Sequence, residues 1–81
     1  MGSRLKVSVG RKALLARINR KLKPDLRTVR TLRGNRSRRE VGDYYEVDLN
    51  RNAIVAMHVD LEDYARELGV LTEWERLEEE A

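Results

Sequence analysis

Apolar residues recur at helical spacing near the start of the chain. Four of them fall on one stripe of a helix: Leu14, Leu15, Ile18 and Leu22. We expect this helix to run from about Arg11 to Leu22, because Pro24 disfavours helical geometry in the residue before it. Three basic residues fall on the other side of the same helix: Arg17, Arg20 and Lys21.

Apolar and polar residues alternate between positions 44 and 58, which predicts a β-hairpin. We expect a three-residue loop at positions 50–52, with Asn52 in the left-handed conformation that such loops need. One face of the hairpin would then be apolar and carry the core: Tyr45, Val47, Leu49, Ala53, Val55 and Met57. The other face would hold Tyr44, Glu46, Asp48, Ile54, Ala56 and His58.

The C-terminal part of the sequence predicts two helices. Asp60 is a suitable N-cap for the first, and Gly69 is a natural C-terminal stop. Thr72 and Glu75 have the spacing of a capping box, which predicts that a second short helix follows. We expect Trp74 to pack against the sheet and residues 78–81 to fray.

Residues 24–33 fit two local structures. Their apolar residues are spaced by three, as in a short helix, whereas the β-branched Thr28, Val29 and Thr31 favour a strand. We favour the strand, because Gly34 and Asn35 then form a turn before the hairpin. Residues 34–40 lack apolar side chains and are expected to form a loop on either interpretation.

Together these elements predict a small single α+β domain spanning residues 1–81. It would have an N-terminal helix, a two- or three-stranded antiparallel sheet arranged as a meander, and two C-terminal helices. Residues 1–9 are expected to be flexible or the remnant of a tag. Helices would cover one face of the sheet, and the other face would be partly exposed.

Charge changes this picture, because it is divided between the two halves of the chain. Residues 1–40 carry fourteen Lys and Arg residues and two acidic residues, a net charge of +12. Residues 41–81 carry three Arg and twelve acidic residues, a net charge of −9. Thirteen of the seventeen basic residues are Arg, whose planar fork suits phosphate. The division favours a polyanionic partner.

Arginine occurs at every third position from Arg27 to Arg39, a spacing that fits no single face of a strand or helix. We therefore expect a positive protrusion that, with the first helix, contacts phosphate. The expected nucleic-acid-binding residues are Arg17, Arg20, Lys21, Arg30, Arg33, Arg36, Arg38 and Arg39. Duplex DNA is favoured over single strands, because only Tyr44 is a candidate for base stacking.

The sequence offers little for catalysis. It has no cysteine and a single histidine, and it lacks a nucleophile paired with a base, a phosphate-cradling glycine loop and a set of metal ligands. Glu46, Asp48 and His58 share a predicted face, which we interpret as solvated cross-strand neighbours. We expect a protein that is not an enzyme and that uses no cofactor or metal. No apolar run approaches the ~20 residues that would span a membrane.

Two other interpretations stay open. The acidic C-terminal half fits a protein-binding module, such as an inhibitor of a host defence complex, docking on a basic partner. The opposite charges of the two halves also fit a homo-oligomer assembled head to tail, whose contacts would weaken as salt rises.

Most of the chain resembles a group of short uncharacterised proteins carried on proteobacterial plasmids, integrative elements and phages. The residues behind the resemblance are 13–22, Tyr44-Tyr45, Val47-Asp48, Arg51-Asn52, 58–61, 66–70 and Trp74-Glu75. The resemblance implies a bacterial, cytoplasmic protein of a mobile element, and it assigns no role to any residue. DNA-binding accessory factors and inhibitors of host defence are common among small proteins in that context.

Overall fold

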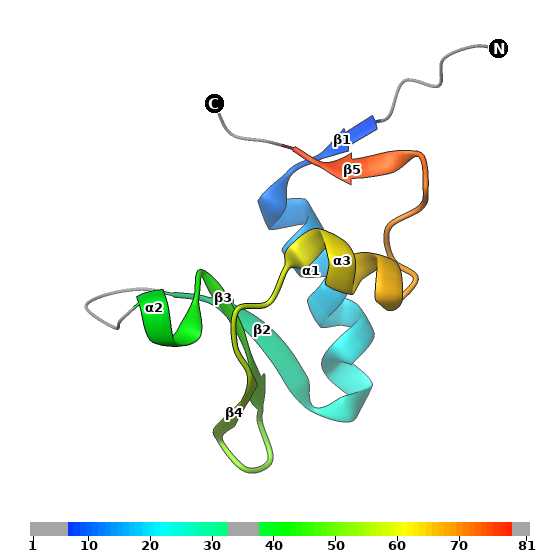
Figure 1. Ribbon diagram of the computed structural model, residues 1–81. Helices are drawn as coiled ribbons and strands as arrows, with labels where there is room; N and C mark the ends of the chain where they lie inside the picture. The colour runs from blue at the N-terminus through cyan, green and yellow to red at the C-terminus, as the bar shows by residue number, and fades with distance from the viewer. Residues whose placement is uncertain (1–6, 33–37, 79–81) are drawn as a thin grey trace, which may run out of the picture.

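The computed structural model describes residues 7–32 and 38–78, and its elements are arranged as an α+β fold (Figure 1). We expected residues 1–6 to be flexible, residues 34–37 to be part of a loop and residues 79–81 to fray. These residues lie outside the described ranges. In chain order the elements are β1 (Val7–Val9), α1 (Arg11–Leu22), the 3-10 turn η1 (Lys23–Asp25), β2 (Arg27–Thr31), α2 (Arg38–Val41), β3 (Tyr44–Asp48), β4 (Ala53–Ala56), α3 (Leu61–Glu67) and β5 (Glu75–Leu77).

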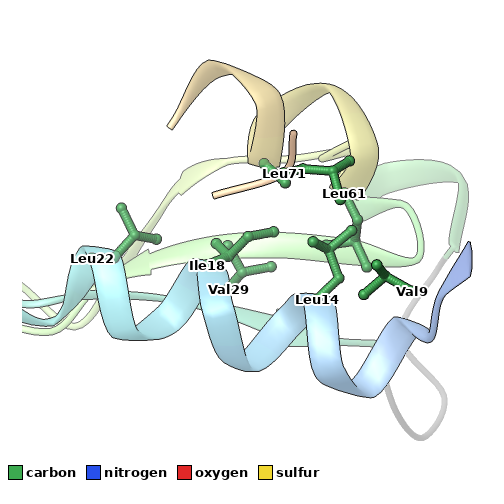
Figure 2. Close-up of a cluster of buried hydrophobic side chains, with 8 residues drawn as sticks. Val9, Leu14, Ile18, Leu22, Val29, Leu61 and Leu71 are labelled. Carbon is green, nitrogen blue, oxygen red and sulfur yellow. The ribbon is translucent and has the colours of Figure 1, made fainter. Parts of the chain in front are cut away.

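Helix α1 has the predicted bounds, and its apolar stripe forms the centre of the core. Leu14, Ile18 and Leu22 are buried, and Leu15 is half-buried against the same cluster. In Figure 2 these three buried side chains point from α1 toward Val29 of the sheet and toward α3. The remaining buried members of the cluster are Val9, Val29, Leu61, Ala65 and Leu71. Removing this apolar surface from water is the main stabilising contribution to a chain of this size.

The main sheet is a three-stranded antiparallel meander with the order β2-β3-β4. Residues 27–31 therefore form the strand that we favoured over a helix. The chain enters β2 through Leu26, which has a φ of 58° and whose carbonyl accepts from the Leu49 amide at 2.9 Å. The predicted loop at 34–40 is wrong at its end, because α2 begins at Arg38.

The hairpin exists, but its predicted register is wrong. Asp48 pairs with Ala53 and Val47 with Ile54, so the loop has four residues, 49–52, instead of three. Val55 is an extra residue in β4, since the next pair is Glu46 with Ala56. Asn52 does adopt the expected left-handed conformation, with a φ of 54°. The bulge and the longer loop together leave Leu49, Val55 and Met57 exposed.

The predicted inner and outer faces of the hairpin are also reversed. Val29 of β2 faces α1 and pairs with Glu46 of β3, so Tyr44 and Glu46 lie on the helix-covered face. Tyr44 packs against the core cluster, and Glu46 is only 4% exposed. Val47, which we expected in the core, points to the opposite face, where it is buried outside the core cluster.

At the C-terminal end only the first predicted helix forms. The side chain of Asp60 caps α3 by accepting from the Asp63 amide at 3.1 Å, and Gly69 ends it with a φ of 77°. The second predicted helix is replaced by β5, which pairs in parallel with β1. Residues 7–9, which we assigned to a flexible segment, are therefore a strand. Trp74 does not pack against the sheet and is 59% exposed.

Candidate nucleic-acid interface

The solvent-facing side of α1 carries a continuous basic stripe. Lys12, Ala16 and Arg20 are spaced by four, and Lys23 follows with helical backbone angles, so the four residues share one face. All four are exposed, on the side of α1 away from Leu14 and Ile18. From Lys12 to Lys23 the stripe is about 16 Å long, at about 1.5 Å per residue.

The cations of this surface have no paired carboxylate within the described parts of the chain. Lys12, Arg20, Lys21 and Lys23 make no ion pair with any carboxylate among residues 7–32 and 38–78. Arg20 and Lys21 lie in the last turn of α1, where positive charge is favourable for the helix dipole. We call Lys12, Arg20 and Lys23, together with Lys21 at the edge of this face beside Arg20, the α1 basic surface.

Arg17, which we predicted as a phosphate ligand, is engaged inside the protein. Its Nη1 lies 3.0 Å from Oε1 of Glu75 and donates to the Val70 carbonyl at 3.1 Å. The hydrogen bond from Arg17, together with one from the Thr72 amide, lowers the pKa of Glu75 to about 2. Arg17 therefore joins α1 to β5, and this role removes it from the α1 basic surface.

The other predicted arginines do not join this surface. Arg30 is exposed, but it alternates with the inward-facing Val29 and so lies on the sheet face away from α1. Arg38 and Arg39 lie in α2, where only the backbone is described. Arg33 and Arg36 lie outside the described residues.

The basic residues of α1 border separate hollows at its two ends. Lys12 lines a hollow of about 330 Å³ with Thr31, so the C-terminal end of β2 lies beside the first turn of α1. Arg20 and Lys21 border a different hollow of about 460 Å³, together with Val70. In Figure 1, α2 and the C-terminal end of α1 lie on different sides of the molecule. Of the predicted arginines whose side chains are described, Arg30 is thus separated from the basic residues of α1 by the sheet.

Exposed aromatic surface is found where the sequence did not predict it. Tyr44, the expected stacking residue, is half-buried against the core. Trp74 is exposed instead, next in the chain to the Arg17 partner Glu75. No local signal indicated this, because Trp74 is exposed only once residues 75–77 become a strand.

The proposed solvated cluster of Glu46, Asp48 and His58 does not form. Glu46 is buried, and its Oε1 accepts from the Tyr64 hydroxyl at 2.7 Å, while Arg27 lies 3.5 Å from its Oε2. His58 lines a separate hollow of about 430 Å³ that also includes Asp43 and Asp60. Within the described residues, no group of three His, Asp or Glu side chains is placed to hold a metal ion.

Sequence reasoning missed one member of the α1 basic surface and undervalued another. Lys23 follows Lys12 by eleven residues, which is three helical turns, and this spacing was the available signal. Pro24 predicts an end to helical geometry before Lys23, whereas η1 continues the chain in a helical conformation. Lys12 is basic in the sequence, but its position on the exposed stripe comes from the structure.

Comparison with protein-family models, curated proteins and solved structures gave no match to this chain. Within the described ranges, α1 is the longest helix, and neither it nor any other is long and apolar enough to cross a bilayer.

Proposed function

We propose that this protein is a non-enzymatic accessory factor that binds the phosphate backbone of nucleic acid through the α1 basic surface. The observation that carries the proposal is that Lys12, Arg20 and Lys21 of α1 and Lys23 of η1 are exposed, without carboxylate partners in the described chain. We propose a second, separate contact through Arg30, which lies on the sheet face away from α1, and through the sequence arginines Arg33, Arg36, Arg38 and Arg39.

Backbone contacts of this kind release counterions, so affinity must fall as salt rises. About four phosphate contacts correspond to a slope of about −3.6 in a plot of log K against log salt on duplex DNA. Contacts from the arginine-rich segment would steepen this slope. The α1 basic surface itself contains no aromatic side chain, so we expect little sequence preference and a preference for duplex over single strands.

Fluorescence anisotropy with a labelled duplex and a single strand of the same sequence, between about 50 mM and about 200 mM salt, tests the proposal. The double variant Arg20→Gln/Lys23→Gln should reduce the salt slope by about 2. The double variant Arg51→Gln/Arg76→Gln has the same net charge but changes exposed arginines elsewhere, and its slope should equal that of the wild type. Absence of binding at about 50 mM salt, or affinity indifferent to salt, would overturn the proposal.

Replacing Trp74 tests whether the protein prefers duplex or single-stranded nucleic acid. Its exposed ring lies beside the residue that binds Arg17, so a single strand that reaches it gains stacking energy. Trp74→Ala should leave duplex affinity unchanged if duplex DNA is the ligand. If single-stranded affinity exceeds duplex affinity and falls about tenfold in Trp74→Ala, the preference for duplex DNA is wrong.

A second candidate function is a protein-binding module, such as an inhibitor of a host defence complex, that uses the acidic half. The observation that favours it is the exposure of both Trp74 and Val7, whose backbones are joined by a hydrogen bond of 2.9 Å. Tryptophan is enriched among residues that dominate binding energy at protein interfaces.

Pull-down from a bacterial lysate tests this second candidate. Capture should be lost in Trp74→Ala and in Glu73→Lys and retained in Arg20→Gln/Lys23→Gln. Glu75 is unsuitable as a test position, because its replacement would remove the internal partner of Arg17. Capture that follows the α1 basic surface instead would exclude the acidic half as the binding region.

A further inference from the structure

The two edge strands of the main sheet, β2 and β4, differ in whether other groups bond to their outward-facing backbone. At the β2 edge, the Asn19 side chain of α1 donates to the Val29 carbonyl at 3.1 Å and accepts from the Val29 amide at 2.7 Å. The amide group of one side chain thus makes both bonds that a neighbouring strand would make. Since an open strand edge is a template for pairing with another chain, this edge is protected.

At the β4 edge, which is four residues long and contains the bulge at Val55, no side chain of the described residues makes such bonds. Within residues 7–32 and 38–78, Ala53–Ala56 form backbone hydrogen bonds only with β3. The apolar side chains along it face solvent, with Val55 44% and Met57 54% exposed. An exposed apolar edge is therefore available for strand pairing.

An acidic recess of about 240 Å³ lies at the C-terminal end of β4. Ala56 and Met57 line the recess next to β4. Its acidic lining residues come from β3, from the N-cap of α3 and from α3 itself: Glu46, Asp60, Asp63 and Glu67. Glu46 is more than nine-tenths buried, and its Oε2, which has no hydrogen-bond donor in the described structure, is paired with Nη1 of Arg27 at 3.5 Å. The three other carboxylates of the recess are in addition to this pair, so the recess keeps a negative charge that favours a further cation.

Arg51 is a cation that could reach such a recess in a second copy, because it lies in the loop just before β4, at the opposite end of the strand from the recess. Arg51 lies in the hairpin loop with its side chain 79% exposed, and its only described ion pair is a long one, 3.9 Å to Asp48. Asp48 points to the same sheet face as Glu46, so Arg51 lies on the side of the sheet that holds the recess. In an antiparallel pair of β4 strands, the start of each strand lies beside the end of the other.

We propose that two copies of this chain pair through β4, antiparallel about a twofold axis, with Arg51 of each copy entering the acidic recess of the other. The contact is self-complementary, since each copy contributes the same edge, the same arginine and the same recess. The pairing would join two three-stranded sheets into one of six strands. This inference rests on the β4 edge alone and is independent of nucleic-acid binding.

Analytical ultracentrifugation of the full chain tests the proposal. The wild type should change from the 9.5 kDa monomer to twice that mass as concentration rises toward about 1 mM. Val55→Lys places a charge on the exposed edge without touching the core and should abolish the dimer. Arg51→Glu should do the same, and Arg76→Glu, an exposed arginine of β5, should dimerise like the wild type.

A mixing experiment identifies the charged contact. Arg51→Glu chains should be monomeric, because the new carboxylate would face an acidic recess. Asp63→Lys/Glu67→Lys chains should also be monomeric, because Arg51 would face a basic recess. Mixed together, the two variants should form a heterodimer through the contact in which the new carboxylate of one chain enters the basic recess of the other.

Three outcomes overturn the proposal. One is a wild type that stays monomeric up to about 1 mM. Another is a dimer that Val55→Lys or the Arg51 and recess variants leave intact, because it must form elsewhere. The third is a monomeric chain whose β4 edge binds a hexapeptide of alternating lysine and valine, because the edge would then take a foreign basic strand instead of a second copy.

Discussion

Nη1 of Arg17 lies 3.0 Å from Oε1 of Glu75, and this pair connects the first helix to the last strand. Glu75 also accepts from the backbone amide and the hydroxyl of Thr72, at 3.0 Å and 3.1 Å. One carboxylate thus fixes the turn that leads into β5 and holds it against α1. Residues from the two oppositely charged halves of the chain meet here within one molecule.

Arg17 and Arg20 should differ in their effect on stability, although both are arginines of the same helix. Arg17→Met removes the contacts to Glu75 and to the Val70 carbonyl, so we expect the melting temperature to fall by several degrees. Arg20→Met changes an exposed residue without a described partner and should stay within about 0.5 kcal/mol of the wild type. Thermal unfolding followed by circular dichroism measures both. Equal shifts would contradict the structural role of Arg17.

Glu75 should make the stability depend on acid pH. Its pKa is lowered from 4.5 to about 2 in the folded state, so the unfolded chain binds the proton more readily as the pH falls. Its contribution to stability is therefore complete above pH 4.5 and is lost as the pH falls toward 2. The wild type should exceed Glu75→Gln in stability near pH 6, and the difference should shrink toward about pH 2. Urea unfolding at a series of pH values tests this, and a constant difference would contradict it.

Asn19 should stabilise the fold through its two hydrogen bonds to Val29. Asn19→Ala leaves the Val29 amide and carbonyl without partners at a half-buried edge, which should cost about 1–3 kcal/mol. Asn50→Ala is a matched control, because the Asn50 side chain is exposed in a loop and makes no described hydrogen bond. Chemical denaturation should show a change within about 0.5 kcal/mol for the control. A similar loss in both variants would mean that Asn19 does not act through the sheet edge.

Gly42 and Gly69 both have positive φ values, of 78° and 77°, but their surroundings differ. A methyl group at Gly42 would lie 2.7 Å from Nδ1 and 2.8 Å from Cα of His58, whereas one at Gly69 meets nothing within 4 Å. Gly69→Ala should therefore cost only the backbone strain, about 1–2 kcal/mol. Gly42→Ala adds a clash with backbone and should cost roughly 3 kcal/mol or more. Chemical denaturation of both variants compares them, and equal losses would exclude the clash.

The elements predicted well are those whose signals are local. The stripe from Leu14 to Leu22 defines α1, and Asp60 and Gly69 mark the bounds of the segment that contains α3. The spacing of Thr72 and Glu75 was also a real signal, since the two residues do hydrogen-bond to each other. It failed to give a helix because residues 75–77 pair with residues 7–9, a contact that no local pattern contains.

Burial of Glu46 explains why the faces of the hairpin were reversed. A glutamate in a strand normally indicates the solvent side, so the alternation placed Glu46 outward and Val47 inward. The structure satisfies Glu46 with the Tyr64 hydroxyl and places Arg27 nearby, which makes its burial tolerable. The same cluster, by burial of the hydroxyl and by its bond to Glu46, raises the pKa of Tyr64 to about 12. Neither partner is near Glu46 in the sequence.

The positive charge of the candidate site was predictable from the sequence, but the positions of its residues in the fold were not. Two of the predicted residues, Arg20 and Lys21, are exposed on α1, as expected for basic residues opposite an apolar stripe. The sequence did not reveal that Arg17 is neutralised or that Arg30 lies on the other face of the sheet, because both depend on long-range packing.

The pairing of β1 with β5 delays completion of the fold while this protein is being synthesised. On the ribosome, residues 7–9 emerge early, yet their partner strand does not exist until residues 75–77 have been added. Closing so long a loop is entropically unfavourable until the intervening elements have collapsed. The nascent chain therefore carries β1 without its partner strand until residues 75–77 have been synthesised.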